Sequence, residues 1–292
     1  AGGPHAAVFR EECSKIFDAL IIGDGEEIIV AAVNDVISGG LKKAYEQNTV
    51  LDLNRYHYPL RGYLPASTIA RKGLLAMKTR QGYGELLSTT VMFSRGCPYS
   101  CSFCAMPQLK AYAPGIRYRA PKLIEEEIEY LKRDYGIQAI SLLDEIGIPP
   151  GIKQAIPHLE AIGRTGIVWK GQCRSDGITP ETAALAKDAG CAVMCFGVES
   201  AVQKSLDLIN KNLDMAKVKD SIRLMKKAGI ECRIYMILGL PAEPEDIVER
   251  TWEFIKETAP DMVFLSLLTV RPGTDMYNNP KKFGMKSVTS DW

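Results

Sequence analysis

From Leu87 onward, short apolar runs alternate with amphipathic patterns, and this alternation constrains the fold more than any other feature of the chain. The apolar runs have the length of strands, and the patterns between them repeat at the three-to-four-residue spacing of a helix face. The predicted strands are Ser88–Phe93, Ala139–Leu143, Ile167–Gln172, Ala192–Val198, Glu231–Leu238 and Met262–Thr269. Strands joined by crossover helices form parallel sheets, so the sequence predicts an α/β fold, either a doubly wound sheet or an incomplete barrel.

Capping residues support the helices between these strands. Thr179 and Asp214 stand where helix N-caps are expected, and Pro121 and Pro180 stand where a first helical residue tolerates the loss of an N–H group. Gly229 is placed to end the helix that begins near Asp214. The functional groups of such a fold are expected where its strands end and its loops begin.

The first 86 residues are less regular. Asp18–Gly23 predicts a short buried strand, and residues from Glu26 to about Tyr45 show helical spacing. One strand and one helix cannot bury a core alone, so we expect them to belong to a larger α/β unit. Residues 46–86 are expected to form a polar, irregular connector, with a short helix near Ser67–Met77.

Charge and composition favour small-molecule chemistry in a reducing compartment. The 292 residues include 36 basic and 35 acidic side chains, and no block of like charge suggests a nucleic-acid groove or an anionic membrane surface. No apolar run approaches the roughly 20 residues that span a bilayer. Eight cysteines without a signal peptide fit a cytoplasmic protein. The chain begins Ala-Gly-Gly-Pro-His without an initiator Met, so we expect a fragment whose upstream part is missing.

Three thiols stand close together directly after the first predicted strand, with the spacing Cys97-x3-Cys101-x2-Cys104. Such a loop can bind three irons of a four-iron four-sulfur cube and leave the fourth iron open. Structural zinc requires four ligands, and His158 lies far along the chain from these cysteines. Zinc with a distant ligand, and thiols that are merely buried, remain the alternatives.

This loop, followed by a series of βα units, resembles the signature of the radical S-adenosylmethionine superfamily. The resemblance implies a partial TIM-like (β/α)6 barrel, a four-iron four-sulfur cluster on Cys97, Cys101 and Cys104, and S-adenosylmethionine bound to the open iron. One electron from the reduced cluster would cleave S-adenosylmethionine to methionine and a 5′-deoxyadenosyl radical, which abstracts hydrogen from a substrate. The protein would supply placement and the exclusion of water and oxygen.

The resemblance also implies contacts to S-adenosylmethionine from residues at successive strand ends. Phe103 would lie against adenine, and Asp144 and Glu145 would face the methionine ammonium. The Leu-Asp-Glu order at Leu143–Glu145 departs from the commoner patterns of the family. Core packing for Phe103 and capping of the next turn for Asp144 and Glu145 are the structural alternatives.

Later strand ends continue the pattern. Arg174 could pair with the methionine carboxylate, although a surface salt bridge is nearly as good an explanation. Gly197-Val198-Glu199-Ser200 resembles the family's Gly-x-Glu-Ser, in which Glu199 and Ser200 would meet the ribose. Gly239 would let the backbone pass close to the cofactor.

Some candidates fall outside this scheme. Arg117 and Arg119 are candidates to orient an anionic substrate or cofactor, although solvated loop arginines are commoner. The remaining cysteines lack a second cluster spacing, so a small apolar role is expected; they are Cys13, Cys173, Cys191, Cys195 and Cys232. Cys173 differs from the others in lying near a strand end.

The N-terminal segments Gly2–Ala6 and Phe17–Glu27 resemble the last part of a Rossmann-like cobalamin-binding domain. This resemblance implies a cobalamin-domain remnant at 1–45, a linker at 46–86 and a core barrel at 87–292. It also implies cobalamin in the full-length protein, an electron donor such as flavodoxin or ferredoxin, and methyl transfer or a related ring-forming or oxidative reaction. The alternatives are a cobalamin-independent, methylthiotransferase-like enzyme, for which a second cysteine set and a basic patch are missing, and a non-catalytic iron–sulfur or zinc module.

Overall fold

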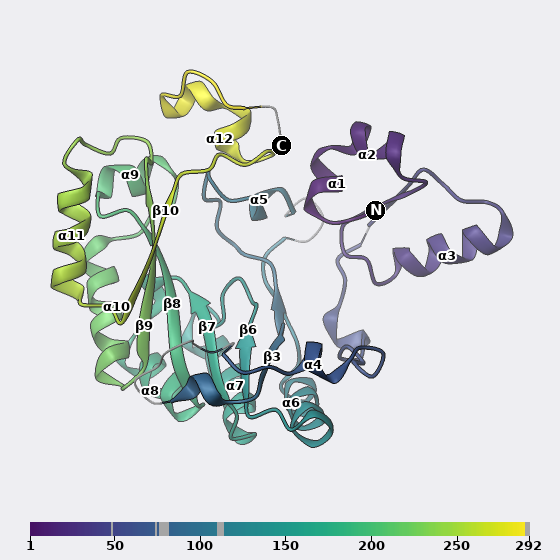
Figure 1. The fold of residues 1–292 in the computed structure, drawn as a ribbon, viewed down its shortest axis with the longest axis horizontal. Coiled ribbons are helices and arrows are strands. Elements are labelled where there is room, and N and C mark those ends of the chain that lie inside the picture. The colour runs from purple at the N-terminus through teal and green to yellow at the C-terminus, as the bar shows by residue number, and fades with distance from the viewer. Residues whose placement is uncertain (48, 74, 76–81, 110–113, 290–292) are drawn as a thin grey trace. The chain divides into compact units, whose positions relative to one another are not determined.

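The computed structural model describes residues 1–292 except 48, 74, 76–81, 110–113 and 290–292 (Figure 1). The chain divides into two compact units, each built from separate stretches of sequence. Unit 1 comprises Ala1–Asp52, Gly96–Ile116 and Thr269–Trp292, and unit 2 comprises Leu53–Arg95 and Arg117–Leu268.

Unit 2 is built on a six-stranded parallel sheet in the order β10-β9-β8-β7-β6-β3. Its strands are β3 (Ser88–Val91), β6 (Ala139–Leu142), β7 (Val168–Cys173), β8 (Cys191–Glu199), β9 (Glu231–Leu238) and β10 (Met262–Leu267). All six predicted strands are confirmed, with bounds within about two residues of those expected. The spatial order follows the chain order without reversal, whereas a doubly wound sheet reverses at its switch point. The sheet is therefore an incomplete barrel.

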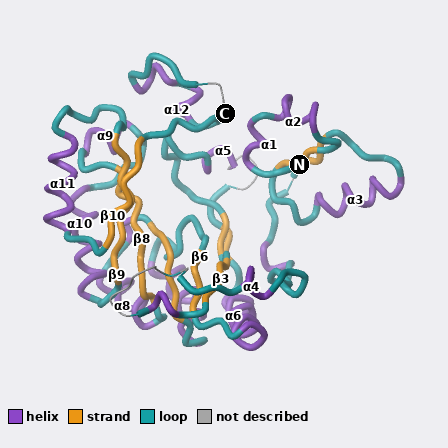
Figure 2. Tube along the Cα trace, viewed as in Figure 1, coloured by secondary structure: helices purple, strands orange, loops and turns teal. Residues whose placement is uncertain are grey.

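Helices cover the outer face of this sheet, as Figure 2 shows for unit 2. They are α6 (Pro121–Tyr135), α7 (Ile152–Arg164), α8 (Pro180–Asp188), α10 (Met215–Lys227) and α11 (Ile247–Thr258), with a short α9 (Gln203–Leu208) after β8. The predicted caps are confirmed: Thr179 forms a capping box with Thr182, and the Asp214 side chain accepts a hydrogen bond from the Ala216 N–H. The fully buried Trp169, Phe196 and Ile140 belong to the core of this unit.

The connector is irregular, as predicted. Its described elements are η1 (Leu53–Arg55), α4 (Ala66–Ile69) and η2 (Tyr83–Glu85). The predicted helix at Ser67–Met77 is shorter than expected, because Arg71 leaves the helical path to pair with Ser88; residues 74, 76 and 77 lie outside the described part. Leu75 is fully buried against Ala139 and Cys195.

Unit 1 contains a small parallel sheet of β1 (Leu20–Ile22) and β2 (Ala44–Glu46), joined through α3 (Ile28–Ser38). The short strand predicted at Asp18–Gly23 is confirmed. The helix predicted to reach Tyr45 is wrong in its C-terminal part, because Gly39 ends it in the left-handed conformation with φ +77° and Tyr45 lies in β2. Unit 1 also contains α1 (Pro4–Val8), α2 (Arg10–Ile16), α5 (Met106–Leu109), α12 (Asp275–Asn278) and η4 (Pro280–Phe283).

Among the helices of the described residues, none combines the length and the apolar character needed to cross a membrane.

Candidate functional site

The three-cysteine loop connects two short strands that pair with each other. β4 (Ser94–Arg95) and β5 (Arg117–Tyr118) are antiparallel, with Ser94 opposite Tyr118 and Arg95 opposite Arg117. This pairing fixes the two chain ends from which the loop departs. At the start of the loop Gly96 has φ +98°, and a Cβ there would lie 2.3 Å from the carbonyl oxygen of Gly115. Only glycine fits this close approach of two backbone segments.

Within the loop, backbone groups order the region around Cys104. The Cys104 N–H donates to the Cys101 carbonyl at 3.1 Å, and the Met106 N–H donates to Cys104 Sγ at 3.4 Å. Cys101 is buried, whereas Cys97, Phe103 and Cys104 are half-buried. Over the described ranges, no three His, Cys, Asp or Glu side chains are gathered as a metal-binding group. The structure therefore places the three thiols on one loop without drawing them around a common point.

The donor set nevertheless fits an iron–sulfur cluster. Thiolates are the usual protein ligands of four-iron four-sulfur clusters, and three of them leave one iron for another ligand. An N–H group directed at Cys104 Sγ favours the charged form of that sulfur. These residues would hold the cluster.

In unit 2, Asp144 joins the end of β6 to the chain that follows β3. Its carboxylate accepts hydrogen bonds from the Phe93 N–H at 2.9 Å and from Ser94 Oγ at 2.6 Å. Burial raises the pKa of Asp144 to about 6, against the effect of these two donors. Both carboxylate oxygens are thus bonded to the segment that leads into the cysteine loop, while the neighbouring Glu145 is half-buried.

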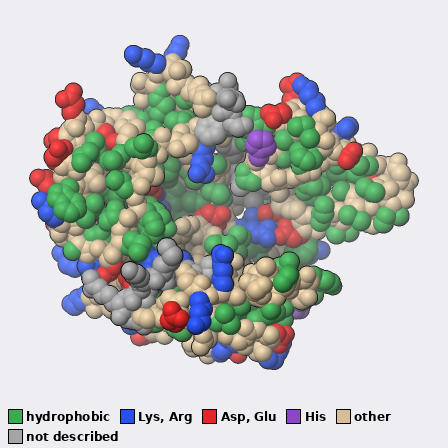
Figure 3. All heavy atoms as spheres, in the orientation of Figure 1, with side chains coloured by type: hydrophobic (Ala, Val, Ile, Leu, Met, Phe, Trp, Pro, Cys, Tyr) green, Lys and Arg blue, Asp and Glu red, His purple; other side chains and the backbone are tan. Residues whose placement is uncertain are grey.

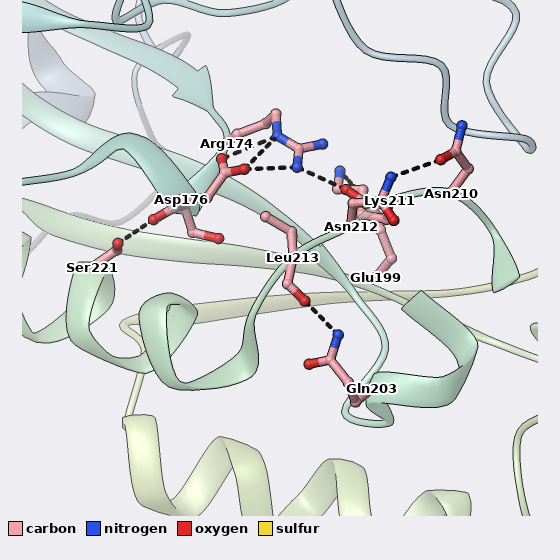
Figure 4. Close-up of polar contacts among 10 residues, drawn as sticks. Arg174, Asp176, Glu199, Gln203, Asn210, Lys211, Asn212, Leu213 and Ser221 are labelled. Carbon is pink, nitrogen blue, oxygen red and sulfur yellow. Dashed lines mark hydrogen bonds and ion pairs between the residues drawn. The ribbon is translucent and has the colours of Figure 1, made fainter. Parts of the chain in front are cut away.

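A second group of charges lies at the carboxyl ends of β7 and β8 (Figure 4). Arg174 pairs with Asp176, with its Nη2 2.8 Å from Asp176 Oδ2, and the same nitrogen donates to the Lys211 carbonyl at 2.7 Å. Lys211 Nζ lies 2.8 Å from Glu199 Oε1 in an ion pair that is about nine-tenths buried on both sides. Arg174 and Glu199, predicted separately from sequence, therefore belong to one network through Lys211.

Glu199 occupies an unusual backbone conformation. Its φ is +71°, a region that non-glycine residues rarely adopt. Strain of this kind is concentrated at functional sites, where the surrounding structure holds the residue in place. The preceding Gly197 leaves room for the carboxylate, since a Cβ at Gly197 would lie 2.5 Å from Glu199 Oε1.

Ser200 and Gly239 are joined by a carboxylate that the sequence prediction missed. Ser200 Oγ lies 2.9 Å from Glu243 Oε1, and Glu243 Oε2 accepts the N–H groups of Gly239 at 2.8 Å and Leu240 at 3.1 Å. The turn after β9 is thus tied to the end of β8. The available signal was an acidic residue four positions after Gly239, at the distance of a tight turn.

Lys211 was also missed. The residue lies twelve positions after Glu199, and no local pattern indicates that the intervening α9 returns it to the strand end. Together the ends of β7, β8 and β9 offer a guanidinium, a carboxylate, a hydroxyl and exposed backbone. This set fits a ligand that combines an amino acid with a nucleoside, as S-adenosylmethionine does.

The scattered cysteines have the apolar role predicted for them. All five are buried. Cys173, the candidate near a strand end, is 6% exposed, and burial raises the pKa of its thiol well above the ordinary value. A thiol of this kind is a poor nucleophile.

The fold and these groups define a class: an enzyme with an incomplete parallel barrel, a three-thiol loop after the first strand, and polar groups at later strand ends. A family model described as the radical SAM superfamily matches residues 91–255, which is more than half of the chain. The chain belongs to this superfamily. Membership implies a four-iron four-sulfur cluster and S-adenosylmethionine as cofactors, as predicted.

Curated relatives are longer than this chain. An uncharacterized methyltransferase of Pyrococcus horikoshii is 30% identical over 289 residues, which cover 94% of this chain and 61% of the relative. The bacteriochlorophyllide d C-12(1)-methyltransferase of Chlorobaculum tepidum is 26% identical, with 96% and 59% covered. The anaerobic magnesium-protoporphyrin IX monomethyl ester cyclase of Cereibacter sphaeroides is 29% identical, with 94% and 47% covered. The chain therefore spans less than two thirds of each of these proteins.

A solved structure shares the fold. TsrM, a radical S-adenosylmethionine methyltransferase from Kitasatospora setae with cobalamin and a four-iron four-sulfur cluster bound, superposes with a TM-score of 0.70. The match has 19% identity and covers 94% of this chain and 56% of TsrM. At this identity the likeness shows the fold alone.

Proposed function

We propose that this chain is the cofactor-binding part of a radical S-adenosylmethionine enzyme that uses cobalamin to methylate a small-molecule substrate. The observation that carries the proposal is the Cys97, Cys101 and Cys104 loop, held between β4 and β5 inside the segment that matches the family. When bound, the cluster supplies an electron to S-adenosylmethionine, and cobalamin supplies a carrier for a methyl group. The names of two relatives support methylation, and the name of a third supports ring formation as the second candidate.

In this proposal the residues of the protein bind the cluster and orient S-adenosylmethionine. Cys97, Cys101 and Cys104 bind three irons, and Phe103 and Glu145 contact S-adenosylmethionine. Asp144 fixes the start of the cysteine loop through Ser94 and Phe93. Arg174 and Glu199 bind the charged and hydroxyl groups of the cofactor while Asp176 and Lys211 hold their orientation. Ser200 and Gly239, joined by Glu243, complete the set.

Cobalamin is proposed from unit 1. The β1-α3-β2 path is a βαβ element, and Gly2 forms a parallel bridge to Ile21 on β1, as in a three-stranded fragment of a Rossmann-like sheet. The exposed apolar side chains of α3 are Ile29, Val30, Val33, Val36 and Ile37. Figure 3 shows apolar side chains gathered on the surface of this helix. Such a face supports membership of a larger α/β domain. The proposed division is a cobalamin-domain remnant at 1–45, a linker at 46–86 and a core at 87–292.

The setting of the reaction follows from the same chemistry. A reduced cluster requires an electron donor such as flavodoxin or ferredoxin. No disulfide joins the eight cysteines, all of which lie in the described part of the chain, and this fits a reducing cytoplasm. We propose a small-molecule substrate and no nucleic-acid or membrane partner.

The first experiment tests radical formation. The protein is reconstituted anaerobically with iron and sulfide, reduced, and given S-adenosylmethionine, and 5′-deoxyadenosine is measured. We expect product from the wild type and from a Cys13→Ala/Cys232→Ala control, which removes two buried thiols outside the loop. A Cys97→Ala/Cys101→Ala/Cys104→Ala variant should give none. Zinc uptake without iron would instead favour the non-catalytic module.

The second experiment separates methylation from ring formation, and uses the full-length protein with cobalamin and candidate substrates. Methyl transfer converts S-adenosylmethionine to S-adenosylhomocysteine, whereas hydrogen abstraction alone gives 5′-deoxyadenosine. We expect both products. Turnover that yields 5′-deoxyadenosine without S-adenosylhomocysteine would refute methylation and favour a cyclase.

A further inference from the structure

Unit 2 contains a cavity of about 190 Å³ beside the edge strand β3. Its walls come from the connector, from the end of β3 and the chain that follows it, from the middle of α6, and from single residues before α6 and after β6. The charged side chains that line it are Arg61, Arg95, Arg119 and Glu127. Three guanidinium groups therefore share one cavity with a single carboxylate.

Arg61 is held against β3 from the connector. Its guanidinium donates to Thr89 Oγ1 and to the Thr90 carbonyl, each at 2.8 Å, and lies 3.6 Å from Glu127 Oε1. The side chain is 14% exposed, and its buried Nε has no hydrogen-bond partner. Because an arginine stays charged at every accessible pH, this site carries a buried cation with a remaining donor.

Arg119 is bonded to neutral groups only. Its two Nη atoms donate to the carbonyls of Tyr56 at 3.2 Å and His57 at 3.1 Å. Within the ranges that the structure describes, Arg119 has no carboxylate within ion-pair distance. These bonds fix the guanidinium in place without neutralising its charge, which is how a preorganised anion site is built.

Glu127 balances only part of this charge. Its carboxylate is 2% exposed, and its Oε2 has no hydrogen-bond partner. Burial raises the pKa of Glu127 to about 7, against the lowering effect of Arg119 and Arg61. The raised pKa weakens the negative charge of Glu127 near neutral pH, and even a fully charged Glu127 would balance only one of the two guanidinium groups of Arg61 and Arg119.

We propose that this cavity binds an oxyanion, the carboxylate or phosphate group of a small ligand, through the guanidinium groups of Arg61 and Arg119. A guanidinium presents paired N–H donors that match the oxygens of either group. None of the residues that line the cavity is among those proposed to bind the cluster or S-adenosylmethionine, and Arg119 is one of the two arginines that the sequence marked as candidates to orient an anionic ligand. The alternative is that Arg61 and Arg119 have a purely structural role and only attach the connector to the sheet.

Isothermal titration calorimetry of the whole chain with inorganic phosphate and, separately, with acetate tests the proposal. Saturable binding of one equivalent is expected for at least one probe, and the stronger probe identifies the preferred group. Arg119→Gln should weaken binding about tenfold or more, because a charge-assisted hydrogen bond is lost. Glu127→Gln should strengthen it about threefold, because the competing negative charge is removed.

Arg133→Gln is the matched control, because Arg133 is an exposed arginine on α6, the helix that begins two residues after Arg119, and it pairs with Asp134. Its affinity should stay within about twofold of wild type. If circular dichroism shows that Arg119→Gln does not fold, Glu127→Gln alone decides the question, since it should fold and bind more tightly. The proposal is wrong if neither probe binds the wild type, or if Glu127→Gln leaves affinity unchanged or lowers it. Those results would support the alternative, in which the two arginines only attach the connector to the sheet.

Discussion

At the scale of single residues, Lys211 contacts both Glu199 and Arg174. Its ammonium forms the buried ion pair with Glu199, and its carbonyl accepts a hydrogen bond from Arg174. Glu199 meanwhile has a strained backbone, with φ +71°. An isolated buried charge is costly, so the lysine is what allows a carboxylate to remain at this strand end.

We therefore expect Lys211→Met to lower the free energy of unfolding by about 3–5 kcal/mol, because Glu199 loses its partner in a buried site. Urea unfolding measures the change. The double variant Lys211→Met/Glu199→Gln should recover more than half of the loss, since no buried charge is then left alone. Lys204→Met, at an exposed position of α9, serves as the control. A loss below about 1 kcal/mol for Lys211→Met would contradict the assignment.

His158 on α7 leads to a prediction about pH. Its ring lies edge-on to Phe93 and Tyr118, with centroids 6.3 and 6.1 Å away, and neither ring nitrogen has a hydrogen-bond partner among the described residues. Burial lowers the pKa of His158 to about 4 from the usual 6.5. The unfolded chain therefore takes up a proton at a higher pH than the folded chain, so this residue costs stability as pH falls from 6.5 to 4.

His158→Phe should remove that cost, which amounts to about 3 kcal/mol across the interval. The measurement is the difference in unfolding free energy between the variant and the wild type at several pH values. The difference should grow in favour of the variant as pH falls from 6.5 to 4, and at pH 7 the variant should be at least as stable as the wild type. His57→Phe, at an exposed position, should leave the profile unchanged. If the unfolding free energies of wild type and His158→Phe change with pH in the same way, His158 is not the source of the pH dependence.

Sequence reasoning reached the members of the site but not their partners. Glu199, Arg174 and Gly239 were predicted because each stands at the end of a predicted strand, where the resemblance to the radical S-adenosylmethionine superfamily implies a contact to S-adenosylmethionine. Lys211 and Glu243 are not visible, because their bonds to Glu199 and Ser200 depend on how α9 and the β9 turn fold back in space. Local patterns carry no information about such tertiary pairs.

At the scale of elements, the cysteine loop depends on a close backbone approach. Gly96→Ala would place a Cβ 2.3 Å from the Gly115 carbonyl at a position with φ +98°. Gly115 has φ +75° but nothing within 4 Å of a Cβ built there, so Gly115→Ala is a control with comparable backbone strain and no collision. Both variants leave all three thiols in place.

After anaerobic reconstitution, we expect Gly96→Ala to hold at least about twofold less iron and sulfide per chain than Gly115→Ala. The reason is that the backbone must shift where the loop begins, which disturbs the spacing of the cluster ligands. Iron and acid-labile sulfide are measured against protein concentration. Equal loading of the two variants would show that the loop tolerates displacement at its start.

Elements with local signals were predictable, and those without them were not. The strands of unit 2 and the caps at Thr179 and Asp214 follow from periodicity and capping chemistry, which act over a few residues. The end of α3 was misjudged because Leu41 continues the apolar spacing past Gly39, although the left-handed glycine there stops the helix. The antiparallel pair β4–β5 was not predicted, since two-residue strands carry no period.

At the scale of the whole molecule, the two units have very different cores. One buried cluster in the described part of unit 1 consists of Ala6, Cys13, Leu20 and Ile22, which lie around β1, and β2 pairs there only with β1. In unit 2, β8 is flanked by β7 and β9 and most of its residues are buried. Local opening is easiest where few apolar contacts must be broken.

Hydrogen–deuterium exchange followed by mass spectrometry should therefore show at least about a hundredfold faster exchange in peptides covering β1 and β2 than in peptides covering β8. Strands β7 and β9 should resemble β8. Residues 62–65 of the connector, which are exposed, provide a fast-exchanging reference. Equal protection of β2 and β8 would mean that unit 1 is stabilised by contacts other than its own small core.

The sheet of unit 2 has one further consequence. Its end strands, β3 and β10, pair with one neighbour each and not with each other. In a closed barrel the strand number and stagger together dictate the diameter. An open sheet is not subject to this relation, so its curvature is set by side-chain packing. The central strands β7–β9, which end at or just before Arg174, Glu199 and Gly239, are each paired on both sides, unlike the two end strands. We therefore expect the curvature at the two ends of the sheet to be less constrained than the positions of the three proposed S-adenosylmethionine contacts.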